Sequence, residues 1–310
     1  MDISVIVATY ERSEILTKTL ESFCGLICEK LKWELIIVDN ADDQATRNVV
    51  NDYERRLPII FLTENKKGKN NALNTALPHA SGSLYVFTDD DVIADHQWLQ
   101  EIWKGALRWP NHNMFGGRIL PAWPGGEKPN IIHENDVFFG GAYSIADWSI
   151  PEGCYTARNV YGPNMTVRSQ LFKPGIKFNP KIGPEAGKQY VMGSETEFLL
   201  RMEREGNNAV WLPNALVYHQ IREDQLTRKW LTSRAYKNGK SNAVLNTDVS
   251  NCTLIWGIPK YLFRQVVEFY LEYLWATISG SERRKVQKGI KFWYIWGKTH
   301  QLIIERFNTV

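Results

Sequence analysis

The sequence predicts an α/β protein with a mostly parallel sheet flanked by helices, followed by a helical C-terminal extension. Over the first 100 residues, short apolar runs typical of buried strands alternate with segments of helical periodicity. Repeated βα units with short connections favour a parallel sheet with right-handed crossovers. From residue 226 onward the pattern is helical, which predicts the extension.

Each unit of this alternation can be assigned in turn. The expected strands are at 3–8, 33–38, 59–62 and 84–88, and the expected helices at 11–31, 42–56 and 69–77. The middle of the chain, about 110–190, is rich in glycine, proline and aromatic residues and predicts strands and long loops. A helix at 194–205, short strands at 210–212 and 216–218, and a long aromatic helix at 260–278 follow.

These elements predict two domains. Residues 1–225 form the first, divided into a half at 1–110 with the βα units and a half at 111–225 with the long loops. Residues 226–310 form the helical extension. Ligands of such sheets bind outside the carboxyl ends of the strands, so the polar residues that follow each strand are the candidates for chemistry.

Composition excludes several classes of protein. The 310 residues are 23% charged and 44% hydrophobic with a net charge of +3, which argues against disorder and against a nucleic-acid partner. The four cysteines lack the two pairs that a zinc site needs, and they indicate a reduced, cytosolic chain. The N-terminus reads as a strand and not as a signal peptide, and no apolar run is long enough to predict a membrane-spanning helix.

The strongest chemical signal is the acidic triplet Asp89-Asp90-Asp91, directly after a predicted strand. Three adjacent carboxylates without nearby counter-charges predict a divalent cation, Mn²⁺ or Mg²⁺, held by one or two carboxylates and substrate phosphates. Strand alternation would direct Asp89 and Asp91 to one side and Asp90 to the other. A solvated acidic turn at the start of the next helix is the alternative.

Several blocks of sequence, in order, resemble family 2 glycosyltransferases, which have the A-type glycosyltransferase fold. Besides the acidic triplet, they are Val5-Ile6-Val7-Ala8-Thr9-Tyr10-Glu11-Arg12, Ile36-Ile37-Val38-Asp39-Asn40, the stretch 64–74, Asn159-Val160-Tyr161-Gly162-Pro163-Asn164-Met165, Gly193-Ser194-Glu195-Thr196-Glu197-Phe198 and Val217-Tyr218-His219. The resemblance covers about residues 3–240. It implies the nucleotide-diphospho-sugar transferase-like architecture.

The resemblance also implies roles for individual residues. The donor-binding set would be Thr9, Tyr10, Glu11, Asp39, Lys69, Asp89 and Asp90. In this set, Asp39 would accept a hydrogen bond from the nucleobase of the donor. Lys69 would lie near the nucleotide or its phosphates, and Asp89 would contact the ribose or the metal. Asp91 would ligate the metal, and His219 would complete the metal or phosphate site. An ordinary turn residue at Asp39, a solvated lysine at Lys69 and a structural histidine at His219 are the alternatives.

The general base is where the sequence departs from the family. Members usually have Glu-Asp at the position of Ser194-Glu195, with the aspartate as the base. Here Glu195 would take the proton from the acceptor hydroxyl, with Glu197 as the alternative. The two residues are two positions apart on a predicted helix, so only one of them can face the site.

The implied activity is that of a metal-dependent, inverting glycosyltransferase of the hexosyltransferase type, active in polysaccharide or cell-envelope biosynthesis. The expected partners are a nucleotide-sugar donor, of which a UDP-sugar is the commonest in the family, and a glycan or lipid-linked acceptor. A non-catalytic nucleotide- or sugar-binding module of the same fold is the main alternative. A nucleotidyltransferase is disfavoured, because Ala8-Thr9-Tyr10-Glu11 is not a glycine-rich basic loop.

The C-terminal segment allows two interpretations. The helix at 260–278 is apolar around most of its circumference, and residues 281–298 add six basic residues and several aromatic ones. It is either a core helix packed on the catalytic domain or a peripheral membrane element. In the second case the cytoplasmic protein would lie at the inner face of the cell membrane.

Overall fold

The computed structural model describes residues 1–132, 137–184, 192–246 and 252–307. The chain divides into two compact units. The sheet unit consists of Met1–Ala122, Ser144–Lys188 and Gly193–Gln220. The helical unit consists of Trp123–Tyr143, Gln189–Met192 and Ile221–Val310.

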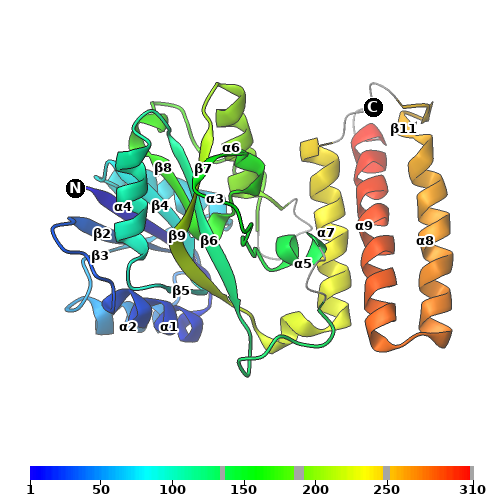
Figure 1. The fold of residues 1–310 in the computed structure, drawn as a ribbon, viewed down its shortest axis with the longest axis horizontal. Helices are drawn as coiled ribbons and strands as arrows, with labels where there is room; N and C mark the ends of the chain where they lie inside the picture. Colours follow the sequence, from blue (N-terminus) through cyan, green and yellow to red (C-terminus); the bar gives the residue numbers. More distant parts are fainter. Residues whose placement is uncertain (133–136, 185–191, 247–251, 308–310) are drawn as a thin grey trace. The chain divides into compact units, whose positions relative to one another are not determined.

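Among the described residues, nine strands form the mixed sheet of the sheet unit (Figure 1). They are β1 (Ile3–Thr9), β2 (Trp33–Asp39), β3 (Ile59–Thr63), β4 (Leu84–Asp89), β5 (Val92–Ala94), β6 (Met114–Ala122), β7 (Gly153–Tyr155), β8 (Met165–Arg168) and β9 (Ala209–Gln220). Their order is β3-β2-β1-β4-β8-β6-β9-β5, with β7 also beside β9. The first four are parallel to one another, as predicted, whereas β8 is antiparallel to β4 and β6.

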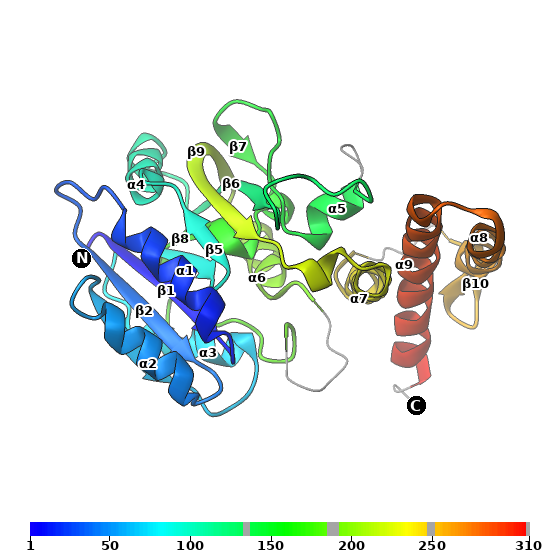
Figure 2. The ribbon, with the colours of Figure 1, turned by 90° about the horizontal axis from the view of Figure 1, so that it is seen from below.

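Helices cover both faces of the parallel strands. They are α1 (Ser13–Cys24), α2 (Gln44–Tyr53), α3 (Lys69–Ala76), α4 (Trp98–Arg108) and α6 (Ser194–Arg204). Short 3-10 turns lie at Leu77–His79, Ala157–Asn159, Gly162–Asn164 and Ser169–Leu171. Figure 2 shows α1 and α2 side by side along β1 and β2, and these two helices contact each other.

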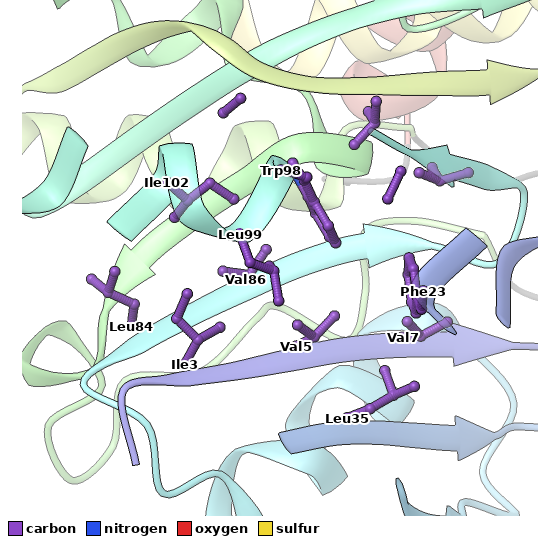
Figure 3. Packing of buried hydrophobic residues seen from close by; sticks show 14 of the residues in the cluster. Ile3, Val5, Val7, Phe23, Leu35, Leu84, Val86, Trp98, Leu99 and Ile102 are labelled. Atoms are coloured by element: carbon purple, nitrogen blue, oxygen red, sulfur yellow. The ribbon is translucent and has the colours of Figure 1, made fainter. Parts of the chain in front are cut away.

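The alternation of β1 explains why two cores form. Val5 and Val7 point to one face, where Figure 3 shows them with Phe23 of α1 and Trp98 of α4. Ile6 points to the other face, into a second cluster that includes side chains of α3 and α6. Because successive side chains of a strand point to opposite faces, a strand with apolar residues at both odd and even positions needs helices on both sides of the sheet.

Two predicted elements differ from the structure. The helix expected at 11–31 ends at Cys24, because Gly25 follows and its N–H bonds to the carbonyls of Ser22 and Phe23. The strands expected at 210–212 and 216–218 are one strand, β9, with an irregularity in its pairing with β6. Leu212 pairs with Gly117 and Leu216 with Arg118, so the residues between them bulge out of the ladder.

The helical unit contains α5 (Val137–Ala142), η5 (Glu223–Leu226), α7 (Arg228–Asn246), α8 (Lys260–Ser279) and α9 (Glu282–Phe307), with a small hairpin of β10 (Leu254–Ile255) and β11 (Ile258–Pro259). Figure 1 shows α9 between α7 and α8, and it contacts both. Helices α7 and α9 approach closely at a pair of glycines: a β-carbon on Gly239 would meet the carbonyl of Tyr294, and one on Gly297 that of Tyr236. No helix in the described parts of the chain is both long and apolar enough to cross a bilayer.

Candidate active site

The carboxyl ends of the parallel strands bring the predicted residues to one edge of the sheet. Thr9 at the end of β1 pairs in register with Asp39 at the end of β2. Ala8 on β1 pairs with Asp89, the last residue of β4. This alignment follows from parallel pairing, in which every strand ends at the same edge, and it places the acidic triplet beside the end of β1.

The three aspartates of the triplet do not alternate as a strand would. Strand β4 ends at Asp89, and the next two residues form a turn before β5. Asp90 and Asp91 both form ion pairs with Arg12, whose Nη1 is 3.1 Å from Asp90 Oδ1 and 3.4 Å from Asp91 Oδ2. Asp89 instead contacts Lys69. The expectation that Asp89 and Asp91 share one side is therefore wrong, because alternation stops where the strand stops.

Counter-charges lie next to the triplet, contrary to the expectation from the sequence. Burial alone would lower the pKa of Arg12, but the carboxylates of Asp90 and Asp91 outweigh it and raise that pKa. Burial, and then the negative charge of Asp91, raise the pKa of Asp90 to about 6. Thr9 Oγ1 donates a 2.7 Å hydrogen bond to Asp90 Oδ2, so Asp90 is held inside the protein.

Lys69 connects the triplet to helix α6. Its Nζ lies 2.5 Å from Asp89 Oδ1 and 2.5 Å from Glu195 Oε1. Burial would lower the pKa of this lysine, yet Asp89 and Glu195 together raise it above its ordinary value. The predicted base and the acidic triplet therefore lie at the same edge of the sheet, joined by one ammonium group.

Glu195 and Glu197 point to different partners. Glu197 Oε1 accepts a 3.2 Å hydrogen bond from Arg201 Nε, one turn further along α6. Glu195 reaches Lys69 and passes close to Gly162, where a β-carbon would lie 2.6 Å from Glu195 Oε1. The glycine of the 159–165 block thus leaves the space that the Glu195 carboxylate occupies.

Asp91 and His219 are neighbours across the β5–β9 pairing. His219 Nε2 lies 3.2 Å from Asp91 Oδ1, and both side chains are about nine-tenths buried, with exposures of 10% and 7%. Within the described ranges, no group of three or more His, Cys, Asp or Glu side chains could hold a metal ion. A carboxylate and an imidazole nevertheless fit Mn²⁺ or Mg²⁺, which bind few protein ligands when substrate phosphates supply the rest.

The remaining predicted residues do not join this network of side chains. Asp39 is fully buried, and its two oxygens accept hydrogen bonds from the N–H groups of Ala41 and Asp43. Burial raises its pKa. Tyr10 accepts a 3.0 Å hydrogen bond from Lys67 Nζ. Glu11 is exposed, with a φ of 50° that non-glycine residues seldom adopt.

Two features of this edge were missed in reasoning from the sequence. One is Arg12, whose position just after β1, among the strand-end residues, is the signal that could have indicated a role. The asparagines of α3 hold a distant segment: Asn70 Nδ2 donates to the carbonyls of Asn179 and Ile182, and Asn74 Nδ2 to that of Phe178. Such long-range contacts leave no signal in local periodicity.

Comparison with known proteins decides the family. The profile of Glycosyl transferase family 2 matches residues 4–168, more than half of the chain. The chain belongs to glycosyl transferase family 2. This family 2 enzyme is 24% identical to the glucosyl-dolichyl phosphate glucuronosyltransferase of Haloferax volcanii over 250 residues, which cover 79% of this chain and 78% of the relative.

Solved structures show the same fold. The mannosyltransferase PcManGT of Pyrobaculum calidifontis, in complex with GDP-Man and Mn²⁺, aligns with a TM-score of 0.61 at 16% identity over 97% of this chain and 86% of that one. Staphylococcus aureus TarS 1–349 in complex with UDP-GlcNAc aligns with a TM-score of 0.56 at 16% identity, covering 99% and 92%. The family 2 protein is thus a glycosyltransferase of the A-type fold that takes its sugar from a nucleotide-sugar donor.

Proposed function

We propose that this family 2 enzyme transfers a hexose with inversion from a nucleoside-diphosphate sugar to a hydroxyl of a glycan or lipid-linked acceptor, with Glu195 as the general base. The observation that carries the proposal is the placement of Glu195 at the edge formed by the acidic triplet, linked to Asp89 through Lys69. An inverting displacement needs a base on the face of the sugar opposite the leaving diphosphate. Asp91 and His219 would lie on the side of the leaving diphosphate, and Glu195 would lie on the opposite face of the sugar.

Each residue of the site would have its own role in the transfer. Asp91 and His219 would hold Mn²⁺ or Mg²⁺, and the ion, when bound, would stabilise negative charge on the departing diphosphate. Arg12 places a guanidinium beside Asp90 and Asp91 and keeps these carboxylates in position. The Nζ of Lys69 fixes the carboxylate of Glu195. Glu195 would accept the proton of the acceptor hydroxyl as that oxygen forms the new glycosidic bond.

The donor and the acceptor follow from the same proposal. A UDP-sugar is the expected donor, and Thr9, Tyr10, Glu11 and Asp39 would lie around its nucleoside. The UDP-GlcNAc complex of TarS supports a uridine nucleotide, whereas the GDP-Man complex of PcManGT supports guanosine. A lipid-linked acceptor is supported by the Haloferax relative, a glucosyl-dolichyl phosphate glucuronosyltransferase. Thermal shift with UDP, GDP and dTDP in the presence of Mn²⁺ would rank the nucleotides.

Substitution of the two glutamates of α6 tests the base. We expect Glu195→Gln to lower turnover by about 10²- to 10⁴-fold, the usual contribution of a general base, with unchanged affinity for the donor in calorimetry. Glu197→Gln is the matched control, because this carboxylate is engaged by Arg201 on the same helix. Full turnover in Glu195→Gln, or loss of turnover only in Glu197→Gln, would remove Glu195 from this role.

A further inference from the structure

Helix α8 carries an exposed apolar face. The exposed apolar side chains of its middle and C-terminal parts recur at intervals of three and four residues, and they are Val267, Tyr270, Leu271, Leu274, Trp275 and Ile278. Ile278 is 81% exposed and Trp275 is 62% exposed. Only Leu262 and Ala276 of this helix are buried. At this spacing the exposed residues line one stripe along the helix, and the stripe has no cover in the described structure.

The apolar stripe continues at the N-terminal end of α8. Phe263 lies one helical turn before Val267, and the ring of Trp256 packs against it edge-on, with centroids 6.5 Å apart. Trp256 is 77% exposed at the turn of the β10–β11 hairpin, next to the exposed Leu254 and Ile255. A helix of 20 residues is about 30 Å long, so the surface is an extended strip and not an isolated patch.

Basic charge accompanies this strip. Residues 260–291 contain seven lysines and arginines and three glutamates, so this stretch alone is more positive than the whole chain, whose net charge is +3. Arg284 and Lys291 of α9 are exposed. Two of the three glutamates are engaged within the unit, since Glu272 pairs with Lys288 and Glu282 with Lys285. The surface therefore combines an apolar strip with a surplus of positive charge.

We propose that the α8 strip docks on a bilayer surface that contains anionic lipids. An amphipathic helix whose apolar side chains include Trp and Tyr lies in the interface plane, while lysines and arginines nearby bind negative headgroups. No described helix can cross the bilayer, so the contact is with its surface. A second copy of the chain fits less well, because apposed α8 strips would bring the positive surplus of one copy against that of the other. This docking is independent of the chemistry proposed for Glu195.

Vesicle flotation with the full chain tests the docking. We expect the protein to float with phosphatidylcholine vesicles that contain phosphatidylglycerol, and much less with pure phosphatidylcholine. Leu271→Glu should weaken partitioning into the vesicles by about thirtyfold, which corresponds to the free energy of burying one leucine side chain. The control is Leu107→Glu on α4, because Leu107 is 63% exposed and Leu271 is 60% exposed. Both variants change exposed side chains, and circular dichroism checks that both are folded.

A double variant separates the electrostatic component of binding from the apolar one. The double variant Arg284→Gln, Lys291→Gln should weaken binding to anionic vesicles by about twenty-fivefold, at about fivefold for each basic residue near the surface, and should not change binding to neutral ones. Absence of flotation with anionic vesicles would overturn the proposal, as would equal losses in Leu271→Glu and Leu107→Glu. A dimer in sedimentation that Leu271→Glu dissociates, without any vesicle binding, would assign the strip to a second copy instead.

Discussion

The edge of the sheet and the α8 strip differ in which side chains are buried and which are exposed. At the edge, charged groups are enclosed and paired: Asp90 and Asp91 are both nearly buried and both contact Arg12. On α8, apolar side chains such as Trp275 and Ile278 are exposed. Enclosed charges cost free energy unless every partner is in place, so their geometry is strictly determined. Exposed apolar groups contribute little to folding, and a contiguous strip of them is suited to a contact outside the unit.

A large effect on donor binding is expected from removing the negative charge of Asp91 at the proposed metal site. Asp91→Asn should weaken Mn²⁺-dependent binding of the nucleotide sugar by about a hundredfold, because the ion would lose the charged ligand that we propose for it. Isothermal calorimetry with and without Mn²⁺ measures this change. Asp42→Asn is the control, since Asp42 is an exposed carboxylate in the loop after β2 that pairs with Arg47. Equal affinities for the donor in wild type and Asp91→Asn would contradict the assignment.

A smaller effect is expected from filling the space beside Glu195. Gly162→Ala places a methyl group against the Glu195 carboxylate, which must then move. Because a displaced catalytic group costs rate steeply, we expect kcat to fall by about tenfold with little change in melting temperature. Gly153→Ala is the matched control, because a β-carbon there meets nothing within 4 Å. Similar kcat values for the two variants would show that Glu195 tolerates the shift.

The enclosed charge of Asp90 should make stability depend on pH. Its pKa is about 6 in the folded protein and 3.8 ordinarily, so in between the folded protein holds a proton that the unfolded chain has released. Relative to Asp90→Asn, stability should therefore rise as pH falls from about 6 to about 4. Urea unfolding of metal-free protein at several pH values measures it. A constant difference between wild type and variant would contradict this prediction.

The smallest effect is expected on the exposed face of α8. Ile278→Ser should change the free energy of unfolding by less than about 0.5 kcal/mol, as surface substitutions usually do. Leu262→Ala on the same helix removes a fully buried side chain and should cost about 2 to 5 kcal/mol. Urea denaturation compares the two. A large loss of stability in Ile278→Ser would show that the strip is part of the unit's own core.

Much of the sheet unit was predictable because its signals are local. The mostly apolar runs of β1, β2 and β4 indicated buried parallel strands, and the acidic triplet marked the edge that we propose as the active site. The pairing of Thr9 with Asp39 follows once the strands are known to be parallel. The position of Arg12 between Asp90 and Asp91 was not predictable, since it depends on how the turn after β4 meets the start of α1.

The sequence by itself determined the class of fold, the family and the acidic edge, because periodicity and short motifs are written in neighbouring residues. Only the tertiary structure decided which charges neutralise the triplet, that Lys69 connects Asp89 to Glu195, and which face of α8 is exposed. Those outcomes depend on contacts between residues as far apart in the chain as Lys69 and Glu195. Folding brings such residues together, and neither their distance in space nor their burial can be read from the order of residues along the chain.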